Sequence, residues 1–204
     1  MNIESHLERI REKIAHGGRV IIGLTGAPGA GKSTIAEALV ERLQGQSVIV
    51  PMDGYHLANV ELARLGRANR KGAEDTFDSA GYVALLRRLR DQTPDEIVYA
   101  PQFRREIEEP IANAIPVFAD TPVVITEGNY LLLDRGHWRH VRALIDEIWF
   151  VDVDDTLRRE RLIARHVQFG RSPEAAEQWV ASSDDVNARL IQSTRDRADY
   201  TIEI

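Results

Sequence analysis

Short apolar runs recur along the chain, and more polar stretches of helical character separate them. Several runs are unbroken, as is typical of parallel β-strands that are covered on both faces. We predict strands at residues 19–25, 47–52, 96–100, 122–128, 147–153 and 200–204. The alternation of strands with helical stretches predicts an α/β fold in layers, with a mainly parallel central sheet and right-handed crossovers.

The stretches between these runs carry apolar residues at helical spacing. We predict helices at residues 32–44, 80–90, 137–146, 154–169 and 173–192. Apolar residues three or four apart from Ile3 to Ile14 predict a further helix, which should pack on the body of the domain. Residues 58–78 lack a clear period, so this segment is either a functional loop or a short helix.

Composition narrows the class of protein. The 204 residues are 43% apolar and 28% charged, which predicts one globular domain over residues 1–204. A net charge of -6 without a long Lys/Arg block argues against nucleic acid as the main partner. The chain has no cysteine, which excludes disulfides, thiolate metal sites and cysteine nucleophiles. Its charged start and the lack of a long apolar run predict a cytoplasmic protein without membrane insertion.

The segment GAPGAGKS, residues 26–33, matches the pattern G-x-x-x-x-G-K-[ST] at each fixed position. It follows a predicted strand and precedes a predicted helix, where glycine-rich backbone binds phosphate. Lys32 should reach the β and γ phosphates, and Ser33 should bind Mg²⁺. The predicted nucleotide-binding residues are Gly26, Ala27, Pro28, Gly29, Ala30, Gly31, Lys32, Ser33 and Thr34.

A phosphate-binding loop of this kind indicates a nucleotide without fixing the reaction. The chain lacks the Asn-Lys-x-Asp motif expected of a GTPase and the Leu-Ser-Gly-Gly signature of an ABC ATPase. The remaining candidates are mostly small-molecule kinases and their relatives.

Carboxylates follow two of the predicted strands: Asp53 in VPMDGYHL and Glu127 in VVITEGNYLLL. In an open α/β sheet, ligands bind beyond the carboxyl ends of the strands, so Asp53 should share a crevice with Ser33. We predict that Asp53 is the base that accepts a proton from a substrate hydroxyl, although Asp-Gly is also a turn signal. Glu127 should bind Mg²⁺ or a substrate hydroxyl, or else form a salt bridge with an arginine.

Six motifs in order resemble the family of uridine kinase, phosphoribulokinase and bacterial pantothenate kinase. They span residues 20–204 and read TGAPGAGKST, VPMDGYHL, RKGAEDTFD, VVITEGNYLLL, LRRERLIARH and ADYTI. The chain looks most like short bacterial members described as fructose-transport-associated kinases. The resemblance implies a P-loop three-layer sandwich with a small helical lid, and ATP- and Mg²⁺-dependent phosphorylation of a hydroxyl on a small metabolite.

The resemblance also implies further site residues. Arg161 and Arg165 fall on the lid segment, about residues 154–175, where they would neutralise charge on the transferring phosphoryl group. Arg158 and Arg159 look like solvated residues. The predicted substrate residues are Asp53, His56, Arg70, Lys71, Arg104, Arg105, Glu127 and Tyr130.

Arg104 departs from the family pattern, because it stands where the family usually has an aspartate. A cation at this position favours an acceptor with a carboxylate or phosphate, and a surface pair with Glu106 or Glu108 explains it equally well. The phosphate acceptor that we expect first is a sugar or sugar derivative, and the second candidate is a nucleoside or pantothenate. A rival of another class is a non-catalytic nucleotide-binding accessory protein of a transport system. We allow for a homodimer, since the sequence does not fix the oligomeric state.

Overall fold

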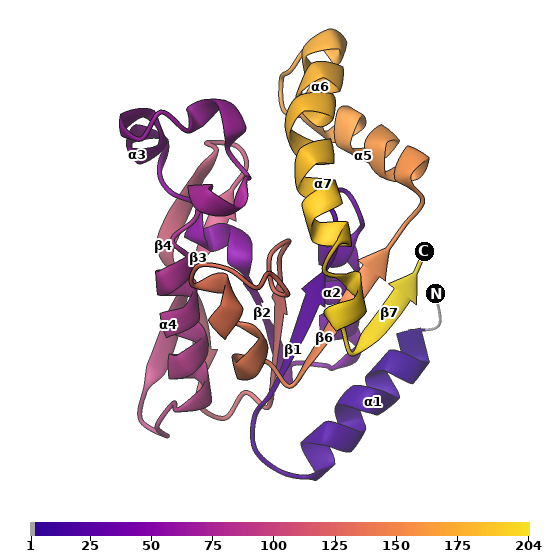
Figure 1. The fold of residues 1–204 in the computed structure, drawn as a ribbon. Helices are drawn as coiled ribbons and strands as arrows, with labels where there is room; N and C mark the ends of the chain where they lie inside the picture. Colours follow the sequence, from indigo (N-terminus) through magenta and orange to yellow (C-terminus); the bar gives the residue numbers. More distant parts are fainter. Residues whose placement is uncertain (1–2) are drawn as a thin grey trace.

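The computed structural model describes residues 3–204, which form two sheets (Figure 1). The larger sheet has the strand order β2-β5-β1-β6-β7, and each of its pairings is parallel. Its strands are β1 (Val20–Thr25), β2 (Ser47–Pro51), β5 (Val123–Glu127), β6 (Glu147–Asp152) and β7 (Tyr200–Glu203). The smaller sheet is an antiparallel hairpin of β3 (Ile97–Arg104) and β4 (Glu109–Phe118). The prediction of an α/β fold with a mainly parallel central sheet is confirmed.

Side chains along a strand point alternately to the two faces of the sheet, so β1 packs in a different apolar cluster on each face. Val20, Ile22 and Leu24 of β1 pack in one apolar cluster with α1 (Ile3–Ala15) and α2 (Lys32–Arg42). Ile21 packs in a second cluster with α4 (Ser79–Arg90) and the hairpin. The remaining helices are α3 (Asn59–Arg64), α5 (Asp155–Gln168), α6 (Pro173–Trp179) and α7 (Asp185–Gln192). The sheet is therefore the middle layer of a three-layer sandwich.

The hairpin was only partly predicted. The apolar run at residues 96–100 belongs to β3, but alternate residues of this strand differ in burial: Val98 is buried whereas Tyr99 is exposed. One-sided burial is typical of an antiparallel ribbon that packs on a core through a single face. Strand β4 was not predicted; it contains Pro110 and Pro116 and a positive φ at Asn113. Proline is tolerated in edge strands because the missing N–H has no ladder partner there.

Two helical predictions need correction. The predicted helix at residues 137–146 was wrong, because this segment consists of short 3₁₀ turns at Trp138–His140 and Arg142–Leu144. The buried Trp138 indole anchors the first turn by donating from Nε1 to the Glu74 carbonyl oxygen, 3.2 Å away. The predicted helix at 173–192 is divided into α6 and α7 by a π-helical turn, Val180–Asp184. Such turns often occur at functional sites.

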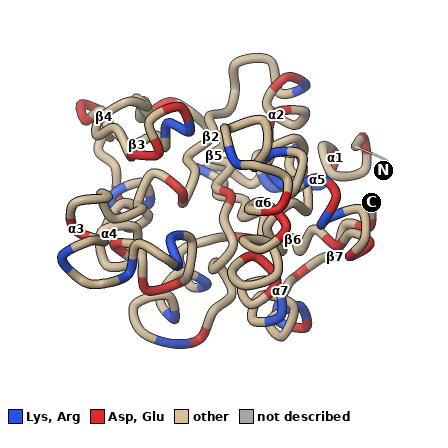
Figure 2. The backbone as a smooth tube through the Cα atoms, turned by 90° about the horizontal axis from the view of Figure 1, so that it is seen from above, with Lys and Arg blue, Asp and Glu red and all other residues tan. Residues whose placement is uncertain are grey.

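The elements beyond the carboxyl edge of the sheet form two groups. In Figure 1, α3 and the hairpin lie on one side, and α5, α6 and α7 lie on the other. Figure 2 shows the same separation from above, with basic and acidic residues interspersed in both groups. No helix within residues 3–204 is long and apolar enough to cross a membrane.

A buried hydroxyl pair fastens α4 to the sheet beside Glu127. Thr126 donates its hydroxyl proton to the Val50 carbonyl oxygen at 2.7 Å. The Tyr82 hydroxyl lies 2.6 Å from the same Thr126 oxygen and must be the donor, since the Thr126 proton is already used. Both side chains are fully buried, so water cannot replace either bond.

We expect Thr126→Val to lower the free energy of unfolding by about 1–3 kcal/mol, because it leaves the Tyr82 hydroxyl buried without a partner. Tyr82→Phe should cost less, since Thr126 keeps its bond to Val50. The double variant should lose less stability than the sum of the two single variants. Urea denaturation of all four proteins measures this, and strictly additive losses would show that the two hydroxyls are not coupled.

Candidate functional site

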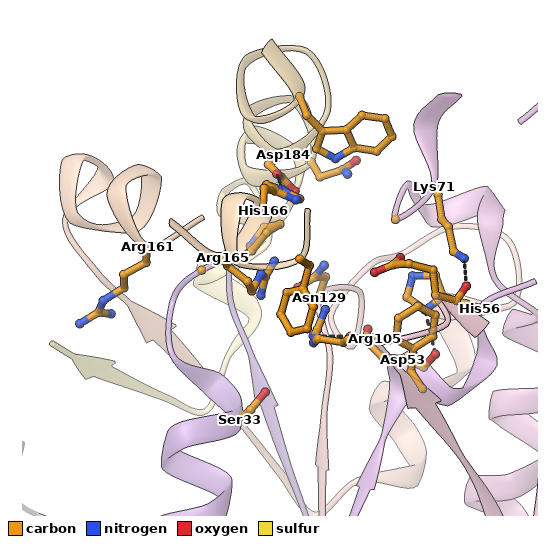
Figure 3. Close-up of a pocket in the computed structure, with 18 of the residues that line it drawn as sticks. Ser33, Asp53, His56, Lys71, Arg105, Asn129, Arg161, Arg165, His166 and Asp184 are labelled. Carbon is orange, nitrogen blue, oxygen red and sulfur yellow. Dashed lines mark hydrogen bonds and ion pairs between the residues drawn. The ribbon is translucent and has the colours of Figure 1, made fainter. Parts of the chain in front are cut away.

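A cleft of about 740 Å³ opens between the two groups of elements. Its floor is the phosphate-binding loop between β1 and α2, together with the carboxyl ends of β2 and β5. Figure 3 shows side chains from both walls pointing into this space. The predicted site residues that line the cleft are Pro28, Gly29, Gly31, Lys32, Ser33, Thr34, Asp53, His56, Lys71, Arg105, Glu127, Arg161 and Arg165.

Lys32 lies at the centre of this floor, and only 8% of its surface is exposed. Its Nζ donates to the carbonyl oxygens of Gly26 and Ala27, at 2.9 and 3.1 Å, and to Asn129 Oδ1 at 2.8 Å. Burial lowers the pKa of Lys32 to about 8, even though the charges of Glu127 and Asp53 act to raise it. The ammonium group is therefore costly to keep charged until an anion enters the cleft.

Glu127 lies at the end of β5 and is also buried. Burial raises the pKa of Glu127, and the nearby charge of Asp53 adds to this effect. Ser33 Oγ donates to Glu127 Oε1 at 3.2 Å, so the structure brings these two predicted metal ligands together. Within residues 3–204, no group of three His, Asp or Glu side chains forms a metal site by itself. A hydroxyl and one carboxylate suit Mg²⁺ that takes its other ligands from phosphate and water.

Asp53 lies in a 3₁₀ turn, Met52–Tyr55, directly after β2. Its carboxylate contacts Arg105 of the β3–β4 connection, with Oδ2 3.5 Å from Nη2. The next residue must be glycine, because a Cβ at position 54 would overlap the carbonyl oxygen of Pro101 in β3. The Asp-Gly pair thus forms a turn and also lets the hairpin approach the cleft. His56 Nδ1 donates to the Asp53 carbonyl oxygen at 2.7 Å and closes this turn.

The opposite wall carries the arginines of α5. The Arg165 side chain makes no hydrogen bond or ion pair with any other residue in 3–204, although burial and the nearby Arg105 lower its pKa. Arg161 also lines the cleft and is exposed. The expectation that Arg158 is solvated was wrong: it is 2% exposed, and it donates to Asp185 Oδ1 at 2.7 Å. This bond ties α5 to the start of α7.

Three predicted substrate residues do not line the cleft. Arg70 forms two short bonds with the Asp75 carboxylate, at 2.5 and 2.6 Å. Tyr130 is buried and donates its hydroxyl to the Gly72 carbonyl oxygen at 2.6 Å, which supports the loop below the cleft. Arg104 is exposed at the end of β3. Gly26, Ala27 and Ala30 belong to the phosphate-binding loop without lining the cleft themselves.

Several residues that line the cleft were not assigned a functional role from the sequence. Asn129 is the clearest case, because its amide oxygen holds Lys32. Its position two residues after Glu127, at a strand end, was the available signal. Phe103 and Trp179 also line the cleft, and nothing in their local sequence distinguishes them from core aromatics. His166 of α5 pairs with Asp184 of the π-helical turn at 2.8 Å.

Comparison with known proteins places these features in context. Residues 21–204 match the model of the family described as Phosphoribulokinase / Uridine kinase. The "ATP-dependent kinase-like protein notR'" of Aspergillus versicolor is 40% identical, over 71% of this chain and 88% of that protein. A Schizosaccharomyces pombe protein named "Putative uridine kinase" is 34% identical, over 96% of this chain and 87% of that protein.

A solved structure agrees with the fold over almost its whole length. The crystal structure of a protein named "putative fructose transport system kinase", from Silicibacter sp. TM1040, has a TM-score of 0.90 to this chain. It is 36% identical in sequence, and the alignment covers 99% of each chain.

Contact between α5 and the phosphate-binding loop depends on Gly29. This residue has a φ of 82°, and a Cβ there would lie 2.8 Å from the Arg158 carbonyl oxygen and from Leu162 Cγ. Gly45 has the same φ of 82°, but a Cβ there would meet nothing within 4 Å. The two glycines therefore share a backbone conformation that would strain any residue with a Cβ, but they differ in what surrounds them.

We expect Gly29→Ala to weaken nucleotide binding by roughly tenfold or more, because the added methyl group must push α5 away from the loop. The matched variant Gly45→Ala should lose only about 1–2 kcal/mol of stability to backbone strain, with unchanged nucleotide affinity. Calorimetric titration with MgATP, alongside thermal unfolding, separates the two effects. Equal nucleotide affinity in the two variants would contradict a close fit of α5 on the loop.

Proposed function

Because this chain belongs to the phosphoribulokinase/uridine kinase family and is thus an ATP-dependent small-molecule kinase, we propose that Asp53 is its general base. We further propose that the acceptor is a sugar or a sugar derivative. The observation that carries the first proposal is the place of Asp53 in the same cleft as Lys32 and Ser33 of the phosphate-binding loop. A carboxylate that faces the phosphate site can accept a proton from the attacking hydroxyl.

In the proposed reaction the acceptor hydroxyl attacks the γ-phosphorus of ATP. A bond forms between the hydroxyl oxygen and phosphorus, and the bond from phosphorus to the oxygen that bridges the β and γ phosphates breaks. The hydroxyl proton passes to the Asp53 carboxylate, and ADP leaves with the bridging oxygen. The Arg105 guanidinium lies 3.5 Å from this carboxylate and would help to orient it.

Charge on the phosphates is matched by groups on the floor and on the α5 wall. Lys32 would exchange its contacts with carbonyl oxygens for phosphate oxygens, and incoming anionic charge favours its protonated form. Arg165, which has no partner in the described part of the chain, and Arg161 would approach the phosphates from the proposed lid, residues 154–175. Ser33 and Glu127 would hold Mg²⁺, which neutralises phosphate charge when bound.

The proposed acceptor class follows from the related proteins. The relative named as a fructose transport system kinase shares 36% of its residues over nearly the whole chain, which favours a sugar or a sugar derivative. The relative named as a uridine kinase supports a nucleoside as the second candidate. Pantothenate remains a further alternative. A non-catalytic accessory protein is less well supported, because nucleotide binding alone does not need a carboxylate at position 53.

We expect Asp53→Asn to slow phosphoryl transfer by about 10²–10⁴-fold while MgATP affinity stays within a few-fold of the wild type. Loss of the charge removes the proton acceptor but leaves the phosphate-binding loop intact. ADP release would be measured against sugars, sugar acids, sugar phosphates, nucleosides and pantothenate, and nucleotide affinity by titration. Asp91→Asn, at the exposed end of α4, is the control and should behave as wild type.

Transfer by Asp53→Asn at the wild-type rate would exclude Asp53 as the base. Slow ADP release that no acceptor stimulates, and that is equal in wild type and Asp53→Asn, would instead support the accessory nucleotide-binding function.

A further inference from the structure

The hairpin wall of the cleft presents two cations on one aromatic ring. Lys71 Nζ lies 5.2 Å from the centre of the Phe103 ring, and Arg105 Cζ lies 5.9 Å from it. All three residues line the cleft. Attraction to the ring face restricts both long side chains without neutralising their charge. Lys71 and Arg105 therefore form a pre-organised positive site, which we call the hairpin cation pair.

Lys71 is held in place by neutral groups. Its Nζ donates to Asn59 Oδ1 at 2.6 Å and to the carbonyl oxygen of Glu108 at the hairpin turn. An ammonium group has three protons, so one donor remains for a ligand. Burial lowers the pKa of Lys71, which shows that these neighbours do not fully compensate its charge.

Arg105 has more unused hydrogen-bond donors than Lys71. Its one close carboxylate is that of Asp53, at 3.5 Å, and none of its N–H groups makes a hydrogen bond with any other residue in 3–204. A guanidinium group has five donors in a planar fork that matches a carboxylate or a phosphate. Arg105 can thus bind an anion while it remains beside Asp53.

The surroundings do not cancel this positive charge. The carboxylates of Glu108 and Glu109 act to raise the pKa of Lys71, but burial outweighs them and the pKa is lowered; Glu108 is exposed to water, and Glu109 accepts from the Asn59 backbone N–H. Burial lowers the pKa of the neighbouring His56, which favours its neutral form. Arg161 and Arg165 belong to the opposite wall, where the proposed phosphates of ATP lie. The hairpin cation pair is left for the other substrate.

Three closely packed rings, tilted by about 40° to one another, lie next to the pair. The His56 ring lies 4.0 Å from Phe77 and 4.6 Å from Phe103, measured between ring centres. These separations leave no room for a planar base to insert between the rings. This wall therefore suits an anionic group of the ligand and not a planar base inserted between the rings.

We propose that the phosphate acceptor is itself an anion, and that Lys71 and Arg105 bind its carboxylate or phosphate group beside Asp53. This inference rests on the proposed kinase function and narrows its acceptor class to hydroxy acids and sugar phosphates. Arg105 contacts the base and also belongs to the anion site. The reacting hydroxyl and the negative group must therefore lie close together on one small molecule, which disfavours neutral sugars and nucleosides.

The test compares matched acceptors that differ in charge, with saturating MgATP: ribose, ribonate, ribose 5-phosphate and uridine, and also glycerol and glycerate. We expect the wild type to prefer the charged member of a pair by roughly 100-fold in kcat/KM, since two charge-assisted contacts are involved. Lys71→Gln should reduce this preference by about tenfold, mainly through KM, and should leave the MgATP affinity unchanged. Arg105→Gln should lower both kcat and the preference, because Arg105 also contacts Asp53.

Arg104→Gln is the matched control, because Arg104 is the neighbouring arginine and does not line the cleft. It should keep the preference for the charged acceptor. Lys71→Arg keeps the charge and should retain most of the preference even if Lys71→Gln folds poorly, which thermal unfolding would reveal.

Equal kcat/KM for charged and neutral acceptors in the wild type would overturn the inference and leave the kinase function standing. The same holds if Lys71→Gln slows charged and neutral acceptors alike, since the lysine would then serve the fold or ATP. If no acceptor stimulates ADP release and Asp53→Asn changes nothing, the proposed function fails and this inference fails with it.

Discussion

The buried ammonium group of Lys32 is the interaction on which the rest of the site depends. A charged side chain that is 8% exposed must be surrounded by oxygen atoms, and two segments of the chain supply three of them. The phosphate-binding loop contributes two carbonyl groups, and the segment after β5 contributes Asn129. Because β1 and β5 are neighbouring parallel strands, these oxygens meet at one edge of the sheet. The parallel pairing thus creates both the fold and the floor of the cleft.

The two walls of the cleft differ in how firmly they hold their cations. On the α5 wall, the buried Arg158 joins α5 to α7 through Asp185, while Arg165 is left without a partner. On the hairpin wall, Lys71 and Arg105 both lie over Phe103. The side chains of Arg165 and Lys71 form no ion pair with a carboxylate of the described residues, and Arg105 has only the Asp53 contact at 3.5 Å, so bound anions would stabilise these cations. A reaction between two anionic substrates would use both walls.

The positions of several arginine side chains could not be predicted from the sequence. Arg104 and Arg105 are adjacent in sequence, but Arg104 is the exposed last residue of β3, whereas Arg105 lies in the β3–β4 connection and lines the cleft. The motif drew attention to Arg104, but it is Arg105 whose guanidinium lies beside the Asp53 carboxylate, and this contact joins two segments far apart in the chain. Arg158 was expected in solvent, yet it is buried, and one of its two carboxylate partners, Asp185, lies 27 positions later in the chain. Neither outcome is encoded in local spacing.

Local sequence determined the phosphate-binding loop, the alternation of strands and helices, and the carboxylates at two strand ends, because backbone conformation and burial follow from neighbouring residues. Asp53 and Glu127 could be placed at one edge for the same reason, since the carboxyl ends of parallel strands coincide. Only the tertiary structure decided that Asn129 accepts a hydrogen bond from Lys32, that β4 completes a hairpin, and that Lys71 and Arg105 both contact the Phe103 ring. These contacts join residues far apart in sequence, and their geometry is set by packing across the whole domain.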